Sequence, residues 1–161
     1  MKRKILCLGL VLVFSMPAPL RAQGKFGLGL IVGDPTGFSW KYRMGLNALD
    51  GAVGFSPVDN FRVHVDYLWV AHPFTEQHLS LTYGVGLAAG FGRTEEIETR
   101  NGDTFFSRDE PTGAGIRGPI GLNYMIPRSP VELTLELAPI LIFSPDGGFG
   151  FDGGFAVRFY P

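Results

Sequence analysis

The C-terminal segment of the chain alternates between apolar residues and small or polar ones. An extended chain would place Phe149, Phe151, Gly153, Phe155, Val157 and Phe159 on one face, and Gly150, Asp152, Gly154, Ala156, Arg158 and Tyr160 on the other. Successive side chains of a β-strand point to opposite faces of its sheet. The pattern therefore predicts a strand with one apolar face and one polar, glycine-rich face.

Seven earlier segments show the same two-residue period, and short turns separate most of them. They cover residues 25–33, 38–44, 48–56, 61–69, 78–93, 114–125 and 131–143. We predict an all-β fold in which the eight strands close into an antiparallel, up-and-down transmembrane β-barrel, because only a closed sheet satisfies its backbone in lipid. Pro119 and Pro139 lie inside two of the segments, so we expect a bulge or a local break at each.

The polar face of these segments carries charges of both signs. The predicted lumen charge network consists of Lys41, Arg43, Asp50, Arg62, His64, Asp66, Arg117, Glu132, Glu136, Asp152 and Arg158. Apart from His64 these are five basic and five acidic residues, and an enclosed face must pair its charges. We expect Glu132 to face Arg158 and Arg43 to face Asp50. The apolar face would aggregate in water, so we expect it to face lipid.

Aromatic residues lie at both ends of the predicted strands, as in the two girdles of an outer-membrane barrel. One set is Phe26, Tyr42, Trp69, Tyr124 and Phe159, and the other is Phe38, Phe55, Phe61, Phe91, Phe143 and Phe149. If both termini are periplasmic, the one long connection, residues 94–112, lies outside the cell. Asn101-Gly102 near its centre predicts a hairpin turn. We expect this acidic hairpin to be the site for any extracellular ligand, whose identity the sequence does not give.

The N-terminal residues have the pattern of a secretory signal peptide. Lys2, Arg3 and Lys4 precede an apolar run over residues 5–14, which is too short to span a bilayer as a helix. We expect cleavage after Ala22, with residues 1–22 as the signal peptide and residues 23–161 as the barrel domain. An uncleaved N-terminal anchor is the alternative.

The composition of residues 23–161 excludes a basic surface for nucleic acid and any disulfide bond. They contain ten Lys or Arg and fifteen Asp or Glu, a net charge of −5, so no basic surface is available for nucleic acid. They contain no cysteine, so no disulfide bond can hold the fold.

Residues 152–159 resemble the C-terminal insertion signal that the barrel-assembly machinery recognises in bacterial outer-membrane β-barrels. Asp152, Gly154, Val157 and Phe159 carry this resemblance, although Tyr160 and Pro161 follow the aromatic residue that usually ends such a chain. In pattern, the chain after residue 22 resembles the small eight-stranded outer-membrane barrels of the OmpA/OmpX type. The resemblance implies a location in the cell outer membrane, with membrane lipid and the assembly machinery as partners. It implies no ligand, and we expect no cofactor and no metal.

We therefore expect a structural or interaction protein whose lumen is filled by side chains and conducts no ions. The alternative is an enzyme that modifies lipid A, because His78 and Ser80 share a strand face and resemble the His/Ser arrangement of outer-membrane lipid A deacylases. The expected topology places this pair at the periplasmic end, away from the outer leaflet, so we predict no catalytic site. His64 and Asp66 form a second same-face pair, which we assign to a hydrogen-bond network in the lumen.

Overall fold

The computed structural model describes residues 24–56, 61–91, 94–100, 103–109, 112–144 and 147–161. The predicted signal peptide, residues 1–22, lies outside the described residues. Within the described part of the chain, no helix is long and apolar enough to cross a membrane.

The described residues form an all-β structure. Its strands are β1 (Phe26–Gly33), β2 (Thr36–Arg43), β3 (Asn47–Phe55), β4 (Phe61–Ala71), β5 (Leu79–Phe91), β6 (Thr94–Arg100), β7 (Asp103–Asp109), β8 (Thr112–Arg117), β9 (Ile120–Met125), β10 (Val131–Ser144) and β11 (Gly148–Phe159). Turn-forming residues such as Asp34 and Pro35 stand between the alternating segments, so most strands are joined by short connections. The strands coincide closely with the eight segments predicted from the two-residue period, with β6 and β7 added.

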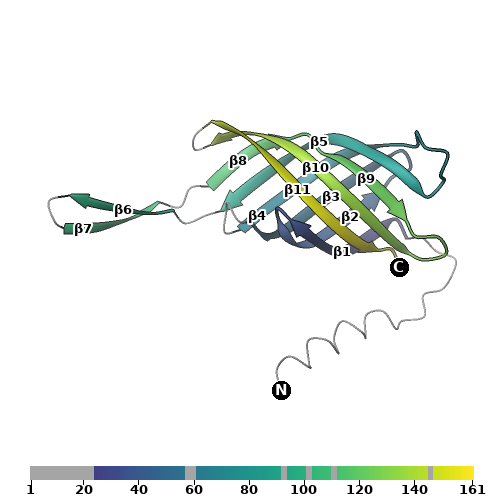
Figure 1. The fold of residues 1–161 in the computed structure, drawn as a ribbon, viewed down its shortest axis with the longest axis horizontal. Coiled ribbons are helices and arrows are strands. Elements are labelled where there is room, and N and C mark those ends of the chain that lie inside the picture. The colour runs from purple at the N-terminus through teal and green to yellow at the C-terminus, as the bar shows by residue number, and fades with distance from the viewer. Residues whose placement is uncertain (1–23, 57–60, 92–93, 101–102, 110–111, 145–146) are drawn as a thin grey trace, which may run out of the picture.

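Nine of these strands form one antiparallel sheet in the order β11-β1-β2-β3-β4-β5-β8-β10-β9, and β11 also pairs with β10 while β5 also pairs with β9. The sheet thus closes into a hydrogen-bonded ring with eight strand positions, because β8 and β9 together occupy the position between β5 and β10 (Figure 1). The ring is uneven in strand length, from 6 residues in β9 to 14 in β10. The prediction of eight antiparallel strand positions is confirmed.

Strands β6 and β7 form a separate two-stranded sheet that extends away from one end of the ring (Figure 1). Arg100 lies opposite Asp103 in this pair, so the hairpin predicted within residues 94–112 is present. The predicted turn, Asn101-Gly102, lies outside the described residues.

The two prolines meet at one interruption of the sheet. Pro119 separates β8 from β9, which confirms the break expected there, but β10 runs through Pro139 without one. The reason is the register: the interruption between β8 and β9 lies opposite Ala138 and Pro139. The carbonyl of Pro139 accepts a hydrogen bond of 2.9 Å from Gly118, and the N–H that proline lacks would point to the same side. The backbone N–H that Pro139 lacks would therefore have faced the interruption between β8 and β9.

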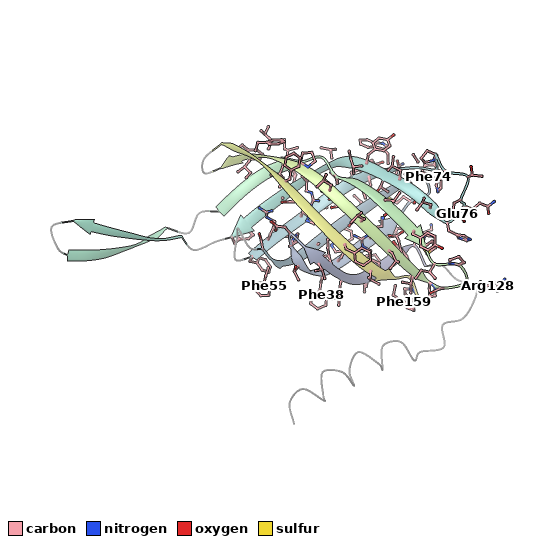
Figure 2. The ribbon with its side chains drawn as sticks, in the orientation of Figure 1. Phe38, Phe55, Phe74, Glu76, Arg128 and Phe159 are labelled. Carbon is pink, nitrogen blue, oxygen red and sulfur yellow. The ribbon has the colours of Figure 1, made fainter. Side chains whose placement is uncertain are left out.

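The distribution of side chains confirms the predicted faces. Large apolar side chains, such as those of Phe38, Phe55 and Phe159, point away from the ring (Figure 2). Charged and polar side chains point inward and are buried. The buried apolar cluster among the described residues is small, consisting of Ile31, Ala52 and Ala156. The ring is therefore polar inside and apolar outside, the reverse of a sheet that folds around an apolar core.

Candidate functional site

The interior of the ring holds two groups of charged side chains. The Arg158 cluster comprises Arg158, Lys41, Asp50 and Glu132 with their polar partners, and the Arg117 cluster comprises Arg117, Arg62, Asp34, His64, Asp66, Glu136 and Asp152. Arg43 lies beside the first cluster at the edge of the ring. All eleven residues of the predicted lumen network therefore belong to these clusters or adjoin them, and Asp34 is an addition that the sequence did not suggest.

Arg158 is at the centre of its cluster and is almost completely buried. It lies opposite Glu132 in the β10–β11 register, and their Nη1 and Oε1 atoms are 3.5 Å apart, which confirms the predicted pair. Its closest acidic partner is Asp50, at 2.9 Å from Nη2. Arg158 also donates hydrogen bonds to Ser39 (2.9 Å) and Thr134 (3.0 Å). The guanidinium thus connects strands β11, β2, β3 and β10 across the interior.

Lys41 extends this cluster toward the end of the ring. Its Nζ donates to Glu132 at 3.0 Å and to Asn123 at 2.8 Å. The predicted pairing of Arg43 with Asp50 is wrong in register, because Lys41 is the residue opposite Asp50 and Arg43 lies opposite Ala48. The Arg43 guanidinium instead lies 4.7 Å from the centre of the Tyr160 ring, a distance typical of a cation–π contact.

In the Arg117 cluster, the Arg117 guanidinium bonds to Glu136 and lies 3.5 Å from Asp66 and 4.0 Å from Asp152. The Arg62 guanidinium bonds to Asp152 and lies 3.3 Å from Asp34. Strands β4, β8, β10 and β11 and the turn between β1 and β2, which holds Asp34, contribute these residues, so the cluster depends on closure of the ring. In this cluster two arginines form ion pairs with four carboxylates.

Glycines make room for the clusters. Gly86 lies opposite Asp66 in the β4–β5 register, and a Cβ atom at Gly86 would be only 1.8 Å from Oδ1 of Asp66. Similarly, a Cβ atom at Gly27 would lie 2.6 Å from the Tyr160 ring. The glycine-rich alternate positions of the sequence are thus explained by the volume of the inward-pointing side chains.

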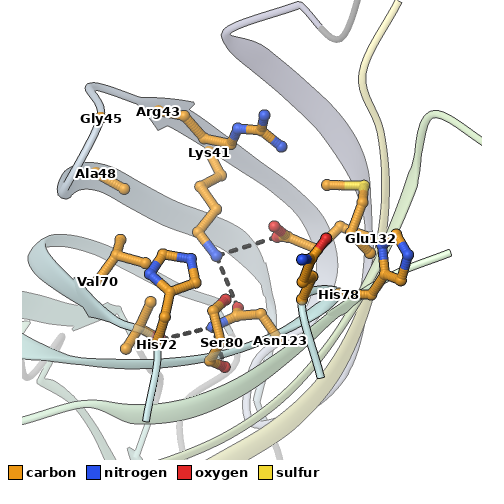
Figure 3. A pocket seen from close by; sticks show the side chains of 13 residues that line it. Lys41, Arg43, Gly45, Ala48, Val70, His72, His78, Ser80, Asn123 and Glu132 are labelled. Carbon is orange, nitrogen blue, oxygen red and sulfur yellow. Dashed lines mark hydrogen bonds and ion pairs between the residues drawn. The ribbon is translucent and has the colours of Figure 1, made fainter. Parts of the chain in front are cut away.

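A polar pocket of about 270 Å³ opens at the end of the ring where β4 and β9 end and where β5 and β10 begin. Figure 3 shows Lys41, His72, His78, Ser80 and Glu132 around it. His78 is exposed and precedes β5, so it lies just outside the strand in which the sequence placed it. His78 and Ser80 share the pocket, but no hydrogen bond joins their side chains in the described structure, so the base-to-hydroxyl contact of a hydrolase is not formed.

His64, Asp66 and Glu136 converge inside the ring. Nε2 of His64 is 3.9 Å from Oδ2 of Asp66, and each of the three residues offers one ligand atom within 4.8 Å of the others. The sequence identified His64 and Asp66 as a pair on one strand but did not connect Glu136 to them, because β10 meets β4 only across the ring. The alternation had also placed Ser39, Asn123, Thr134 and Tyr160 on the inward face, but the predicted network did not include them as hydrogen-bond partners.

The predicted insertion signal divides between the two faces of β11. Asp152 is buried and bonded to Arg62, whereas Val157 and Phe159 are exposed on the outer face. Gly154 points inward, where an added Cβ atom would lie 2.8 Å from the side chain of Ile31.

Comparison with known proteins identifies one family. A family model described as "protein of unknown function (DUF3996)" matches residues 19–159, so the chain belongs to this family. No curated protein and no solved structure matches the chain significantly.

Proposed function

We propose that this DUF3996 protein is an eight-stranded β-barrel of the bacterial outer membrane, whose lumen is filled by side chains and which presents the β6–β7 hairpin outside the cell. Its role is that of a structural or interaction protein. The observation that carries the proposal is the reversed polarity of the ring. Buried ion pairs occupy the interior, and apolar side chains cover the outside.

The outer surface is suited to lipid. Burying one large apolar side chain is worth about 1.5–3 kcal/mol, and more than two dozen such side chains are exposed among the described residues. A hydrocarbon environment would bury those that lie on the strands of the ring. Eight strands enclose a space that side chains can fill, as the two charged clusters do.

Aromatic contacts at the two ends of the ring support girdles at the lipid interfaces. At the pocket end, the Trp69 ring lies 5.4 Å from Tyr67 and 5.8 Å from Tyr83. At the hairpin end, the Phe61 ring lies 6.5 Å from Phe55 and 6.2 Å from Phe91. Two aromatic bands that flank an apolar zone are typical of outer-membrane barrels.

The two ends of the chain supply the remaining support. The predicted signal peptide, residues 1–22, directs export, and the outward-facing Val157 and Phe159 are available to the barrel-assembly machinery at the end of β11. Short links at the pocket end and the longer hairpin at the other end match the periplasmic and external sides of such barrels. The hairpin is the element best placed to meet an extracellular ligand.

Trypsin added to intact cells tests both the location and the orientation. We expect cleavage in the hairpin at Arg100 or Arg108, because residues 94–112 form the external protrusion, while Arg128 in the turn between β9 and β10 is protected. Mass spectrometry of the fragments gives the sites. Arg128 should become a cleavage site once the outer membrane is permeabilised.

Two results would contradict this proposal. Cleavage at Arg128 with the hairpin intact would invert the orientation. Protection of both sites in intact cells, followed by cleavage of both after permeabilisation, would exclude an external hairpin. A variant with Arg93→Gln, Arg100→Gln and Arg108→Gln is the matched control, because Arg93 directly precedes the hairpin and is also a trypsin site, and this variant should resist trypsin in intact cells.

The filled lumen predicts that the purified protein forms no steady channel in planar lipid bilayers. Arg158 and Arg117 lie across the interior and are bonded to carboxylates from several strands. An ion would have to displace these pairs, which costs several kcal/mol for each broken pair. Single-channel recording checks this prediction, and a stable, large conductance would refute the filled lumen.

A further inference from the structure

We infer that His64, Asp66 and Glu136 form a buried site for one divalent transition-metal ion inside the ring. The site lies within the Arg117 cluster, and the inference does not depend on the proposed membrane location. Each side chain supplies one donor atom, an imidazole nitrogen or a carboxylate oxygen, and these atoms lie within 4.8 Å of one another. Zn–N and Zn–O bonds are about 2.0–2.2 Å long, so the three donor atoms would have to move slightly closer together to bind one ion.

Unsatisfied polar atoms mark the same place. Both carboxylate oxygens of Asp66 and Nδ1 of His64 have no hydrogen-bond partner, although these residues are only 0 % and 3 % exposed. Nε2 is the His64 atom nearest Asp66, and Nε and Nη1 of Arg117 in the same cluster also lack hydrogen-bond partners. Buried polar atoms without partners are rare and costly, and an ion or water is a common explanation. Arg117 can compensate only one of the two Asp66 oxygens electrostatically. Its Nε lies 3.5 Å from Oδ1 of Asp66, whereas Oδ2 faces His64.

The charge of the cluster points to a cation. Its two arginines and four carboxylates, Asp34, Asp66, Glu136 and Asp152, give a formal charge of −2 among the described residues. Asp50 also lies directly opposite Asp66 on the neighbouring strand, and like charges in this position repel. A divalent cation would balance this formal charge.

The donor set indicates the class of metal. An imidazole with two carboxylates suits Zn²⁺ and related transition metals better than Mg²⁺ or Ca²⁺, which prefer oxygen donors alone. His64 and Asp66 lie on β4 and Glu136 lies on β10, and these strands are separated in the ring by β5 and β8. The metal would therefore link two sides of the ring that no backbone hydrogen bond connects.

The test uses Zn²⁺ as the probe. The protein is refolded in detergent with Zn²⁺, dialysed, and analysed for bound zinc by mass spectrometry and for thermal unfolding by circular dichroism. We expect one Zn²⁺ per chain and a higher unfolding temperature than without the metal, because a ligand that binds only the folded state stabilises it. His64→Gln and Glu136→Gln, tested separately, should each weaken binding by about 100-fold, since even groups that only support metal ligands are worth 10- to 100-fold.

The matched control is the double variant His72→Gln and His78→Gln, which removes two imidazoles that line the pocket at the end of the ring. This variant should bind one Zn²⁺ as tightly as the unaltered protein. Zinc that is lost in this control but kept in His64→Gln would place the metal in the pocket and overturn the inference. Absence of tightly bound zinc from the unaltered refolded protein would also overturn it.

Discussion

Replacing Arg158 with alanine is expected to lower the free energy of unfolding by about 3–5 kcal/mol, the usual consequence of removing one partner of a buried ion pair. Arg158 is 1 % exposed and holds Asp50 at 2.9 Å and Glu132 at 3.5 Å, so the substitution leaves buried carboxylates with less compensation. Denaturant unfolding in detergent, followed by the fluorescence of Trp40 and Trp69, measures the change.

A second substitution shows which carboxylate depends on Arg158. Asp50→Ala should recover more of the lost stability than Glu132→Ala, because Glu132 keeps Lys41 at 3.0 Å whereas Asp50 has Lys41 only at 4.0 Å. The sequence had predicted Glu132, not Asp50, as the residue that faces Arg158. A larger recovery with Glu132→Ala would show that the register pair, and not the shorter contact, controls the energetics.

Arg43→Ala is the control for this series. Arg43 is only half-buried and lies over the Tyr160 ring at the edge of the lumen. Loss of a cation–π contact is worth about 0.5–1 kcal/mol at such a site. A loss as large as that of Arg158→Ala would contradict a network centred on Arg158.

The two-residue period was sufficient to predict the strands and their faces. Parity along a strand decides whether a side chain points in or out, so Phe38 and Lys41 were assigned correctly without any structure. Eight such segments also predicted the number of strand positions, and the Asn-Gly pair predicted the hairpin.

The pairing of individual charges was harder to predict from the sequence, because it depends on the geometry of the turns. Asp50 was assigned to Arg43 but lies opposite Lys41, a shift of two residues that keeps the face and changes the partner. The turn between β2 and β3 sets this register through Gly45, whose φ of 80° favours glycine, and through a hydrogen bond of 2.7 Å from Met44 to Asn47. Alternation contains no information on such a turn.

Contacts across the lumen were the hardest to predict from the sequence. Glu136 meets His64 and Asp66 only because the ring curves, and β10 does not pair with β4. Likewise, Pro139 could be recognised as a problem for a closed sheet. Only the register of β8 and β9 against β10 shows that Pro139 lies opposite the interruption that contains Pro119.

Replacing Leu137 with arginine is expected to destabilise the protein in a lipid bilayer by about 2–4 kcal/mol, the cost of placing arginine at the middle of the membrane on the lipid side of a barrel. Leu137 is 56 % exposed and lies near the middle of β10 on the outer face. If water covered this face, an exposed leucine could be replaced with a change of only about 0.5 kcal/mol. Denaturant unfolding of the protein folded in phospholipid vesicles measures the difference.

Leu46→Arg is the matched control for this prediction, because Leu46 is 69 % exposed but lies in the turn between β2 and β3, beyond the apolar band. Arginine near the interface costs about 0–1 kcal/mol, so the two leucines, similar in exposure, should differ in their response. The difference would come from the depth of the side chain in lipid, since neither leucine is buried by the protein itself. Equal, small effects at both positions would show that the outer face of the ring does not contact the hydrocarbon core, and the proposed membrane location would then be wrong.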